Sequence, residues 1–368
     1  MDKDRFEITP KQLVFLVVGS EVATGILSLP RVLSAEAGHY AWLAVILGVT
    51  VPVLSIYFIV SLYKDFSEPD FIKVSQLLFG RFLGFVIVVL FSAYIVFFQS
   101  IVIRIFAEIT KTFLLPRTPI FVILFLILFS VYYAVSKGAK TVARLNEILF
   151  WILLVDLLVI IILIPQGDWT AFLPLNELNV TGLLKGAKES FYSYAGIEFL
   201  FVAYVMVNRK EKILKAAFTG QLIVLLLYLM VVVVSLLILG PKSLQYLIWP
   251  VLDLLSVRQI AVLERLEIVF LVFWLGIGAR PVLNLNLASA YSICRLLKLD
   301  NRKYYIWVTL LVVLAIYIIA LIPDNLVVVF KLADFAGSMF LLISLGLPVL
   351  CHIVKFFRKG RIGYEKAS

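Results

Sequence analysis

Residues 19–30 (GSEVATGILSLP) lie in the first hydrophobic stretch of the chain, and residues 190–200 (SFYSYAGIEFL) lie in a corresponding stretch of its second half. Both segments carry glycines and polar residues where an unbroken membrane helix would be apolar. Backbone that leaves the helical ladder at membrane depth is tolerated only where protein or a water-filled cavity satisfies its polar groups. Two interrupted segments at matching positions of two halves are typical of a transporter-type binding site. The pair therefore predicts a substrate site inside a bilayer.

The composition is that of a polytopic membrane protein. Of the 368 residues, 63% are hydrophobic and only 15% are charged, which excludes an ordinary soluble domain. The 33 basic and 23 acidic residues give a net charge of +10. Most of the basic residues fall in short loops, so the positive-inside rule explains them better than nucleic-acid binding does. Two cysteines and two histidines, far apart in sequence, support neither a disulfide framework nor a metal site, and we expect no cofactor.

The apolar runs divide into ten segments of the roughly 20 residues that are needed to cross a bilayer. The predicted spans are residues 11–34, 40–63, 82–114, 119–136, 142–165, 183–207, 214–239, 261–293, 304–322 and 326–356. Residues 243–255 are also apolar but too short to span, so we expect a surface or re-entrant segment there. The boundaries of the eighth span are the least defined.

Five spans in each half predict two repeats of opposite topology, the inverted-repeat arrangement of secondary transporters. The domain assignment is one membrane domain over residues 1–368, with repeats at 11–165 and 183–356 and a cytoplasmic tail at 357–368. In each half the first span is interrupted and the third is unusually long. The termini and the even-numbered connections hold 22 of the 33 basic residues, which predicts that both termini are cytoplasmic.

Thr24, Gly25 and Ile26 lie near the middle of the first span, and Gly25 is the expected point of opening. Opening exposes N–H groups at the start of the outer half-helix and carbonyls at the end of the inner one. A carboxylate can bind the former and an ammonium or cation the latter. The alternative is a glycine that only permits close helix packing.

In the sixth span, residues 192–198 combine hydroxyl groups, a glycine and Glu198. An ionisable group inside a spanning helix is costly and marks a pathway, a proton relay or a ligand contact. The alternative is a structural pair of Glu198 with Arg280 or Arg104. Arg280, in the eighth span, could replace a coupling cation, hold a carboxylate or pair with a neighbouring helix. Gln99, in the third span, is expected to face the cavity or to form an interhelical hydrogen bond.

The remaining charged residues inside the predicted spans are Glu21, Arg104, Glu108, Asp156, Glu264, Arg265, Glu267, Lys331 and Asp334. Enzymatic signatures are missing from the sequence. No Ser/His/Asp arrangement, metal motif or P-loop is present, and the glycines of residues 276–278 lie inside a span rather than after a strand. We therefore expect no catalytic residues and no enzyme.

The two breaks resemble those of the amino acid/polyamine/organocation superfamily, whose members have a LeuT-like five-plus-five inverted-repeat fold. Within it, the chain looks like the spore germination B-subunit family, the permease-like component of nutrient germinant receptors. The resemblance extends over nearly the whole chain. It is carried by residues 8–30 (ITPKQLVFLVVGSEVATGILSLP), 115–151 (LPRTPIFVILFLILFSVYYAVSKGAKTVARLNEILFW) and 264–279 (ERLEIVFLVFWLGIGA).

The resemblance implies a nutrient sensor of the spore inner membrane that binds an amino acid or similar small germinant and works with separate A and C subunits. In the superfamily, the backbone at both breaks holds the carboxylate and the amine of an amino acid. The matching positions in this chain are Thr24, Gly25 and Ile26 in the first break and Tyr194, Ala195 and Gly196 in the second. Glu198 matches the acidic position after the second glycine. The first break has a single glycine in place of the common GxG form, which puts a full transporter cycle in question but not ligand binding.

We therefore expect a receptor subunit that binds its germinant between the two breaks and signals germination through partner subunits. We expect ligand binding to shift an equilibrium between two conformational states of the subunit. A ligand does so only by its differential affinity for the two states. The rival hypothesis is a proton-coupled amino-acid transporter, or permease, with Glu198 as proton carrier. A third is an ion channel gated by a nutrient-bound complex. The expected partners are the small germinant, the A and C subunits and the lipid bilayer, without nucleic acid.

Overall fold

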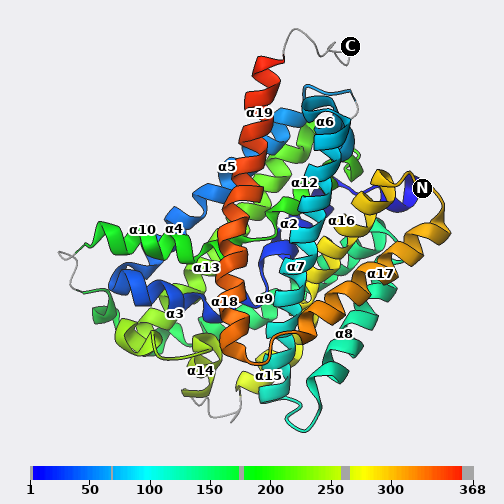
Figure 1. The fold of residues 1–368 in the computed structure, drawn as a ribbon. Helices are drawn as coiled ribbons and strands as arrows, with labels where there is room; N and C mark the ends of the chain where they lie inside the picture. The colour runs from blue at the N-terminus through cyan, green and yellow to red at the C-terminus, as the bar shows by residue number, and fades with distance from the viewer. Residues whose placement is uncertain (1–2, 68, 174–177, 258–265, 359–368) are drawn as a thin grey trace.

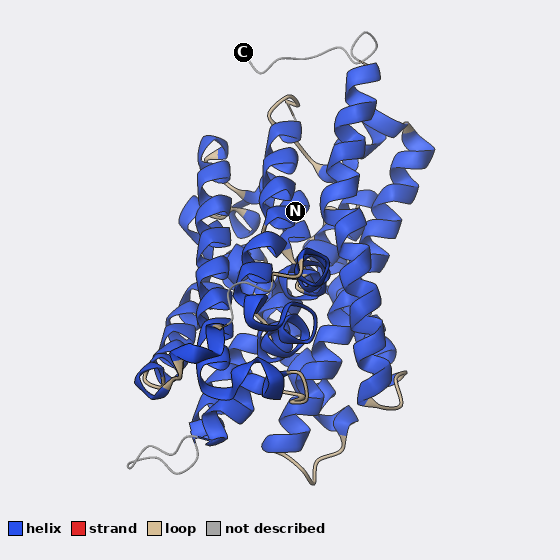
Figure 2. Cartoon of the chain, turned by 90° about the vertical axis from the view of Figure 1, so that its left-hand side faces the viewer, coloured by secondary structure: helices blue, strands red, loops and turns tan. Residues whose placement is uncertain are grey.

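The protein is a helical bundle in a computed structural model that describes residues 3–67, 69–173, 178–257 and 266–358. Figure 1 follows the chain through this bundle, and Figure 2 shows that helices make up nearly all of the described chain. Within these ranges no strand is formed, apart from one isolated bridge between Ile8 and Val207.

The helices of the first half follow the predicted spans closely. They are α1 Lys3–Phe6, α2 Pro10–Glu21, α3 Gly25–Ala37, α4 Ala41–Gly48, α5 Thr50–Tyr63, α6 Phe71–Phe79, α7 Arg81–Phe113, α8 Ile120–Val135 and α9 Ala139–Ile161. Helices α2 and α3 form the first span on either side of a break, and α4 and α5 form the second. Helix α7 has 33 residues, as the long third apolar run predicts.

The helices of the second half repeat this plan. They are α10 Val180–Glu189, α11 Phe191–Tyr194, α12 Leu200–Met206, α13 Ile213–Leu244, α14 Pro250–Val257, α15 Leu266–Gly278, α16 Arg280–Leu296, α17 Arg302–Leu321, α18 Leu326–Phe340 and α19 Leu347–Phe357. The sixth span is broken between α11 and α12, and α13 kinks at Gly240, where φ is +71°. The short α14 takes the place of the predicted surface segment.

The eighth span is a long helical stretch, as the sequence predicts, and it bends where α15 and α16 meet at Ala279. Its predicted start at 261–265 lies outside the described residues. The physical reason for the bend is Pro281, which has no N–H to donate and so frees the carbonyl of Ile277. That carbonyl accepts a hydrogen bond from Nε of Arg280 at 3.2 Å.

The outer surface of the bundle is apolar. Large hydrophobic side chains point away from the protein core on α7, α8 and α17, among them Phe82, Phe125, Phe129, Leu311 and Ile318. In water such a surface would be a strong aggregation site, whereas lipid chains match it. Among the described residues, seven helical stretches are long and apolar enough to cross a membrane, and two shorter apolar helices accompany them. The chain is a multi-pass membrane protein.

Seven is fewer than the ten predicted spans because length alone misses interrupted helices. One of the seven stretches, Gly25–Tyr63, contains parts of two predicted spans. Helix α2 has 12 residues and α12 has 7, too few to cross a bilayer alone. The predicted all-helical architecture, with interrupted first and sixth spans, is confirmed.

The two interrupted spans are joined at one end of the bundle. The chain just before α2 pairs with the chain just after α12, where the amide of Ile8 donates to the carbonyl of Met206 at 2.9 Å. The amide of Asn208 donates to the carbonyl of Ile8 at 3.0 Å. Figure 1 shows the amino-terminal segment and the end of α19 in its upper half. The two broken helices are therefore linked by backbone hydrogen bonds at this end.

We expect cysteines introduced at Ser67 and Gln166 to react from opposite sides of the membrane. Ser67 follows the second span and Gln166 follows the fifth, and both are exposed. By the distribution of basic residues, Ser67→Cys should react from the cytoplasmic side and Gln166→Cys from the other. The measurement is labelling of oriented vesicles with a membrane-impermeant maleimide, with the parent protein, whose Cys294 and Cys351 are both buried, as the unlabelled control. Labelling of both variants from one side contradicts the assigned topology.

Candidate ligand-binding site

The first break lies between α2 and α3. Helix α2 begins with a capping box, in which Thr9 and Gln12 exchange side-chain to backbone hydrogen bonds, and it ends at Glu21. Val22 then turns to φ −75° and ψ 98°, which ends the helical ladder. Gly25 starts α3, so the opening precedes the expected glycine by one to three residues. The amides at the start of α3 and the last carbonyls of α2 are left without helical partners.

The second break lies between α11 and α12. Ala195 is extended, with φ −67° and ψ 137°, and Gly196 has φ +131°, a conformation that L side chains rarely adopt. A short 3-10 segment, Ile197–Phe199, then leads into α12. The sequence predicted the place of this break correctly because Gly196 stands at a position in the break that requires a positive φ.

The two breaks interlock through their glycines. A side chain added at Gly25 would come within 2.9 Å of the Cα of Ser193, and one added at Gly196 would overlap the carbonyl of Ser20. Each glycine thus lies against the backbone of the other broken helix. Both glycines are needed for this close approach, because any Cβ would force the helices apart.

Tyrosine hydroxyls connect the breaks to each other. The hydroxyl of Tyr228, on α13, lies 2.9 Å from the carbonyl of Glu21 and 2.5 Å from that of Ser193, so it can donate to either. The hydroxyls of Thr24 and Tyr192 are 3.3 Å apart. These contacts satisfy polar groups that the breaks release, as burial in a membrane protein requires.

A small cavity lies where the two breaks meet. Its lining residues come from α2, the first break, α3, α7, α11, the second break and α16: Ser20, Glu21, Ala23, Thr24, Gly25, Phe98, Val102, Tyr192, Ala195 and Pro281. Its volume is about 10 Å³, which is room for roughly one water molecule. The structure therefore represents a closed state of this site.

The predicted site residues divide into two groups. Thr24, Gly25 and Ala195 line the cavity. Ile26, Tyr194, Gly196 and Gln99 are buried but do not line it. Gln99 instead donates to the Ser289 hydroxyl on α16 at 3.3 Å, the interhelical hydrogen bond that was its alternative. Tyr194 donates to the carbonyl of Val45 at 3.0 Å.

Two carboxyl groups lie at the breaks, and their surroundings differ. Glu198 is buried, and both of its oxygens accept hydrogen bonds, from the Tyr94 hydroxyl at 2.7 Å and the Gly196 amide at 2.6 Å. It pairs with neither Arg280 nor Arg104 within the described chain. Glu21 accepts one hydrogen bond, from Gln221 at 2.9 Å, and lines the cavity. The sequence analysis noted Glu21 only as a charged residue inside a predicted span. The feature that could have identified it as a site residue is its place directly before the first break.

Arg280 begins α16 and is completely buried. Its Nε donates to Ile277, whereas its two terminal nitrogens have no hydrogen-bond partner in the described chain. Asp156 on α9 is buried close enough to interact with Arg280 electrostatically, and its oxygens also accept no hydrogen bond there. The pair lies beside the site, since Pro281 rather than Arg280 lines the cavity.

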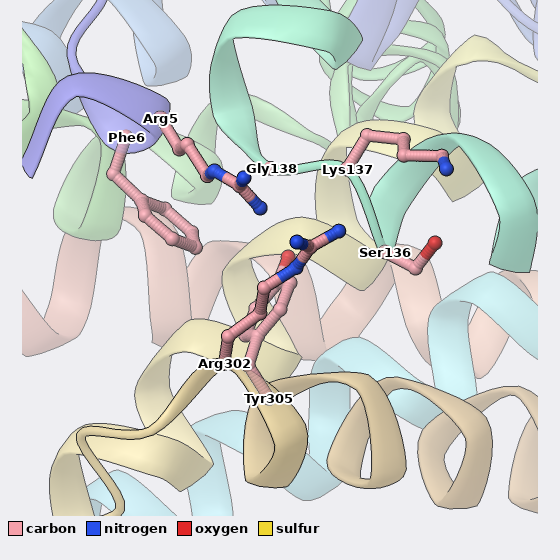
Figure 3. A pocket seen from close by; sticks show the side chains of 7 residues that line it. All are labelled: Arg5, Phe6, Ser136, Lys137, Gly138, Arg302 and Tyr305. Carbon is pink, nitrogen blue, oxygen red and sulfur yellow. The ribbon is translucent and has the colours of Figure 1, made fainter. Parts of the chain in front are cut away.

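A second pocket lies near the amino-terminal segment and is basic (Figure 3). Arg5 and Phe6 of α1, Lys137 of the α8–α9 turn, and Arg302 and Tyr305 of α17 line it. Its volume is about 20 Å³. Basic side chains in short loops are typical of the cytoplasmic side of a membrane protein, so this pocket bears on orientation more than on ligand binding. No group of three or more His, Cys, Asp or Glu side chains that could hold a metal ion was found in the described ranges.

The sequence matches one protein family along most of its length. A profile of the family described as "Spore germination protein" matches residues 7–327. Spore germination protein YndE of Bacillus subtilis (strain 168) is 25% identical, over 96% of this chain and 97% of that protein. Spore germination protein B2 of the same strain is 22% identical, over 98% of each chain. Spore germination protein GerQB of Bacillus cereus is 24% identical, over 73% of this chain and 74% of that protein.

Solved transporters share the fold. MhsT, whose structure was solved in complex with L-phenylalanine, has a TM-score of 0.64 at 13% identity, over 95% of this chain and 98% of that chain. Mhp1, a nucleobase-cation-symport-1 family transporter solved in a closed conformation with bromovinylhydantoin bound, has a TM-score of 0.63 at 15% identity, over 98% and 80%. These similarities confirm the predicted LeuT-like fold, and the family match confirms the resemblance noted in the sequence.

Replacing Gly196 by alanine should destabilise the protein more than replacing Gly240. Both glycines have positive φ, so each substitution costs about 1–3 kcal/mol in backbone strain. Only at Gly196 does the added Cβ meet another backbone, which adds about 1–3 kcal/mol. Thermal unfolding of the two variants in detergent measures the difference. Equal losses of stability would show that the two breaks do not approach as described.

Tyr228→Phe should destabilise the closed site. The substitution leaves the carbonyls of Glu21 and Ser193 without this donor, at a cost of about 1–3 kcal/mol. Tyr317→Phe is the control, because its hydroxyl makes a single 3.3 Å contact at an exposed position. The measurement is again the thermal midpoint, and an equal shift for the two variants argues against a bridging role of Tyr228.

Proposed function

This chain belongs to the family of spore germination proteins, and on that premise we propose that it is the permease-like B subunit of a nutrient germinant receptor. It binds an amino acid or similar small nutrient between the two breaks. Ligand binding shifts its conformational equilibrium, and the A and C subunits sense the shift. The receptor works in the spore inner membrane, with both termini of this subunit on the cytoplasmic side.

The observation that carries this proposal is the cavity between the breaks. Thr24 and Gly25 approach it from the first broken helix, and Tyr192 and Ala195 approach it from the second. The free amides at the start of α3 suit a carboxylate, and the carbonyl end of α2 suits an ammonium group. MhsT, which shares the fold, was solved with an amino acid. The proposed ligand class follows from these groups together.

The size of the cavity supports a receptor that changes state on binding. The cavity has room for roughly one water molecule, and an amino acid is several times larger. A cavity of about 10 Å³ therefore admits no amino acid until the breaks separate. Thr24 and Tyr192 both line the cavity, and the 3.3 Å contact between their hydroxyls joins the two broken helices, so we expect entry of a ligand to separate these groups. A ligand that binds only the open state shifts the equilibrium toward it.

The alternative is a proton-coupled amino-acid transporter, which the solved structures with this fold favour. In this alternative Glu198 releases its proton as the second break moves and its hydrogen bonds to Tyr94 and Gly196 change. Uptake of labelled amino acids into proteoliposomes, with and without a proton gradient, distinguishes the two. Saturable binding without accumulation supports the receptor, whereas gradient-driven accumulation supports the transporter.

Thr24→Val should weaken amino-acid binding by about three- to tenfold. Valine has nearly the shape of threonine, so the change removes one hydrogen-bonding group from the cavity wall and leaves its volume in place. The measurement is equilibrium binding of labelled amino acids to the purified full chain. Thr112→Val, at an exposed position of α7, is the matched control and should bind as the parent does. Unchanged affinity in Thr24→Val would exclude Thr24 from the ligand site.

A further inference from the structure

One of the residues that line the cavity between the breaks has a side-chain oxygen without a hydrogen-bond donor in the described chain. Glu21 is 2% exposed and lines the cavity. Its Oε2 accepts from Nε2 of Gln221 at 2.9 Å, whereas its Oε1 accepts no hydrogen bond from any described residue. Oε1 of Gln221, beside it on α13, has no donor either. A buried acceptor without a donor is costly, so an unsatisfied pair at a cavity requires an explanation.

The neighbouring acid, Glu198, has no such oxygen without a donor. Glu198 has a donor for each of its oxygens, the hydroxyl of Tyr94 and the amide of Gly196. These two hydrogen bonds connect the carboxyl group to the backbone of the second break and to α7. Of the two carboxyl groups at the breaks, only Glu21 has an oxygen free to meet a ligand.

The surroundings of Glu21 favour a positive charge. Glu21 is the last residue of α2, where the helix dipole places a partial negative charge. No lysine or arginine of the described chain forms an ion pair with it. Arg280 on α16 is the nearby buried cation, but its Nε is used by Ile277 and its charge interacts with Asp156. An ionised Glu21 is therefore uncompensated until a cation enters the cavity.

We propose that Glu21 is the ammonium-binding group of this site, with Oε1 as the acceptor and the Gln221 amide as its support. This inference rests on the proposed function and narrows its ligand class to small molecules with a free, protonated amine. An amino acid then binds with its amine toward the end of α2 and its carboxylate toward the start of α3. A side-chain carboxylate distinguishes an amine from an isosteric methyl group more strongly than backbone carbonyls do, because the hydrogen bond is charge-assisted.

The experiment measures equilibrium binding to the full chain in proteoliposomes for three sets of probes. The sets are small amino acids such as L-alanine and L-valine, their amine-free analogues propionate and isovalerate, and their carboxylate-free analogues ethylamine and isobutylamine. Glu21→Gln keeps the size of the side chain and removes its charge. We expect Glu21→Gln to lower the affinity for amine-containing probes by tenfold or more and to leave the weak binding of amine-free probes unchanged.

Two further variants separate recognition from folding. Glu21→Asp keeps the charge and should retain part of the affinity that Glu21→Gln loses. Glu36→Gln, at an exposed position of α3, is the matched control and should bind as the parent does. Thermal midpoints of all variants identify any loss that comes from unfolding.

The outcomes distinguish this inference from the proposed function. Amino-acid binding that Glu21→Gln leaves unchanged overturns the role of Glu21 but not the receptor assignment. If Glu21→Gln leaves the affinity unchanged and raises the thermal midpoint, Glu21 is a protonated, structural carboxyl group. That result also overturns its role in binding the ammonium group. Binding of amines without amino acids, lost in Glu21→Gln, supports the ammonium site and overturns the amino-acid assignment. If the parent chain binds none of the probes, both proposals are wrong.

Discussion

The reciprocal contact between Gly25 and Gly196 is the constraint on which the rest of the site depends. Each glycine lies against the backbone of the opposite broken helix, at Ser193 and Ser20 respectively. Because the backbones meet without intervening side chains, the released carbonyls and amides of both breaks come within reach of the same few groups. The hydroxyl of Tyr228 thus lies within hydrogen-bond distance of one carbonyl from each break and can donate to either. If the helices were spaced by ordinary side chains, these polar groups would have to find separate partners in an apolar bundle.

The same constraint explains why the cavity is small and why its occupancy matters. Two backbones in contact leave room for about one water molecule, so any larger ligand must act as a wedge. The two broken helices are also tied together by backbone hydrogen bonds at Ile8, Met206 and Asn208. These hydrogen bonds form a direct structural connection between the two broken helices away from the cavity. A receptor that must report a bound nutrient to partner proteins, and a transporter that must open to one side, can both use this arrangement.

Local sequence features predicted the fold well because they act locally. The length of each apolar run determines whether it crosses a bilayer, and glycine or proline within a run determines where a helix ends. Both breaks were located to within three residues in this way. The described part of the eighth span, Glu267–Leu296, is one long stretch as predicted, and the bend beside Pro281 is the feature that the sequence analysis did not place. Gln99 was expected to face either the cavity or a neighbouring helix. The rotation of α7 about its axis places its side chain beside Ser289 of α16, to which it donates a hydrogen bond.

Hydrophobic runs and their glycines and prolines were sufficient to predict an all-helical membrane protein with two interrupted spans, and the motifs identified the family. Those properties follow from hydrophobicity and backbone preference, which each segment carries on its own. Which of the two acids lines the cavity depends instead on how the helices pack against one another. Glu198 accepts a hydrogen bond from Tyr94 of α7 and has a donor for each of its oxygens. Glu21 accepts one from Gln221 of α13, and its second oxygen has no donor in the described chain. The two partners are more than 100 residues distant in sequence, and the rotation of each helix about its axis places them, which no local pattern encodes.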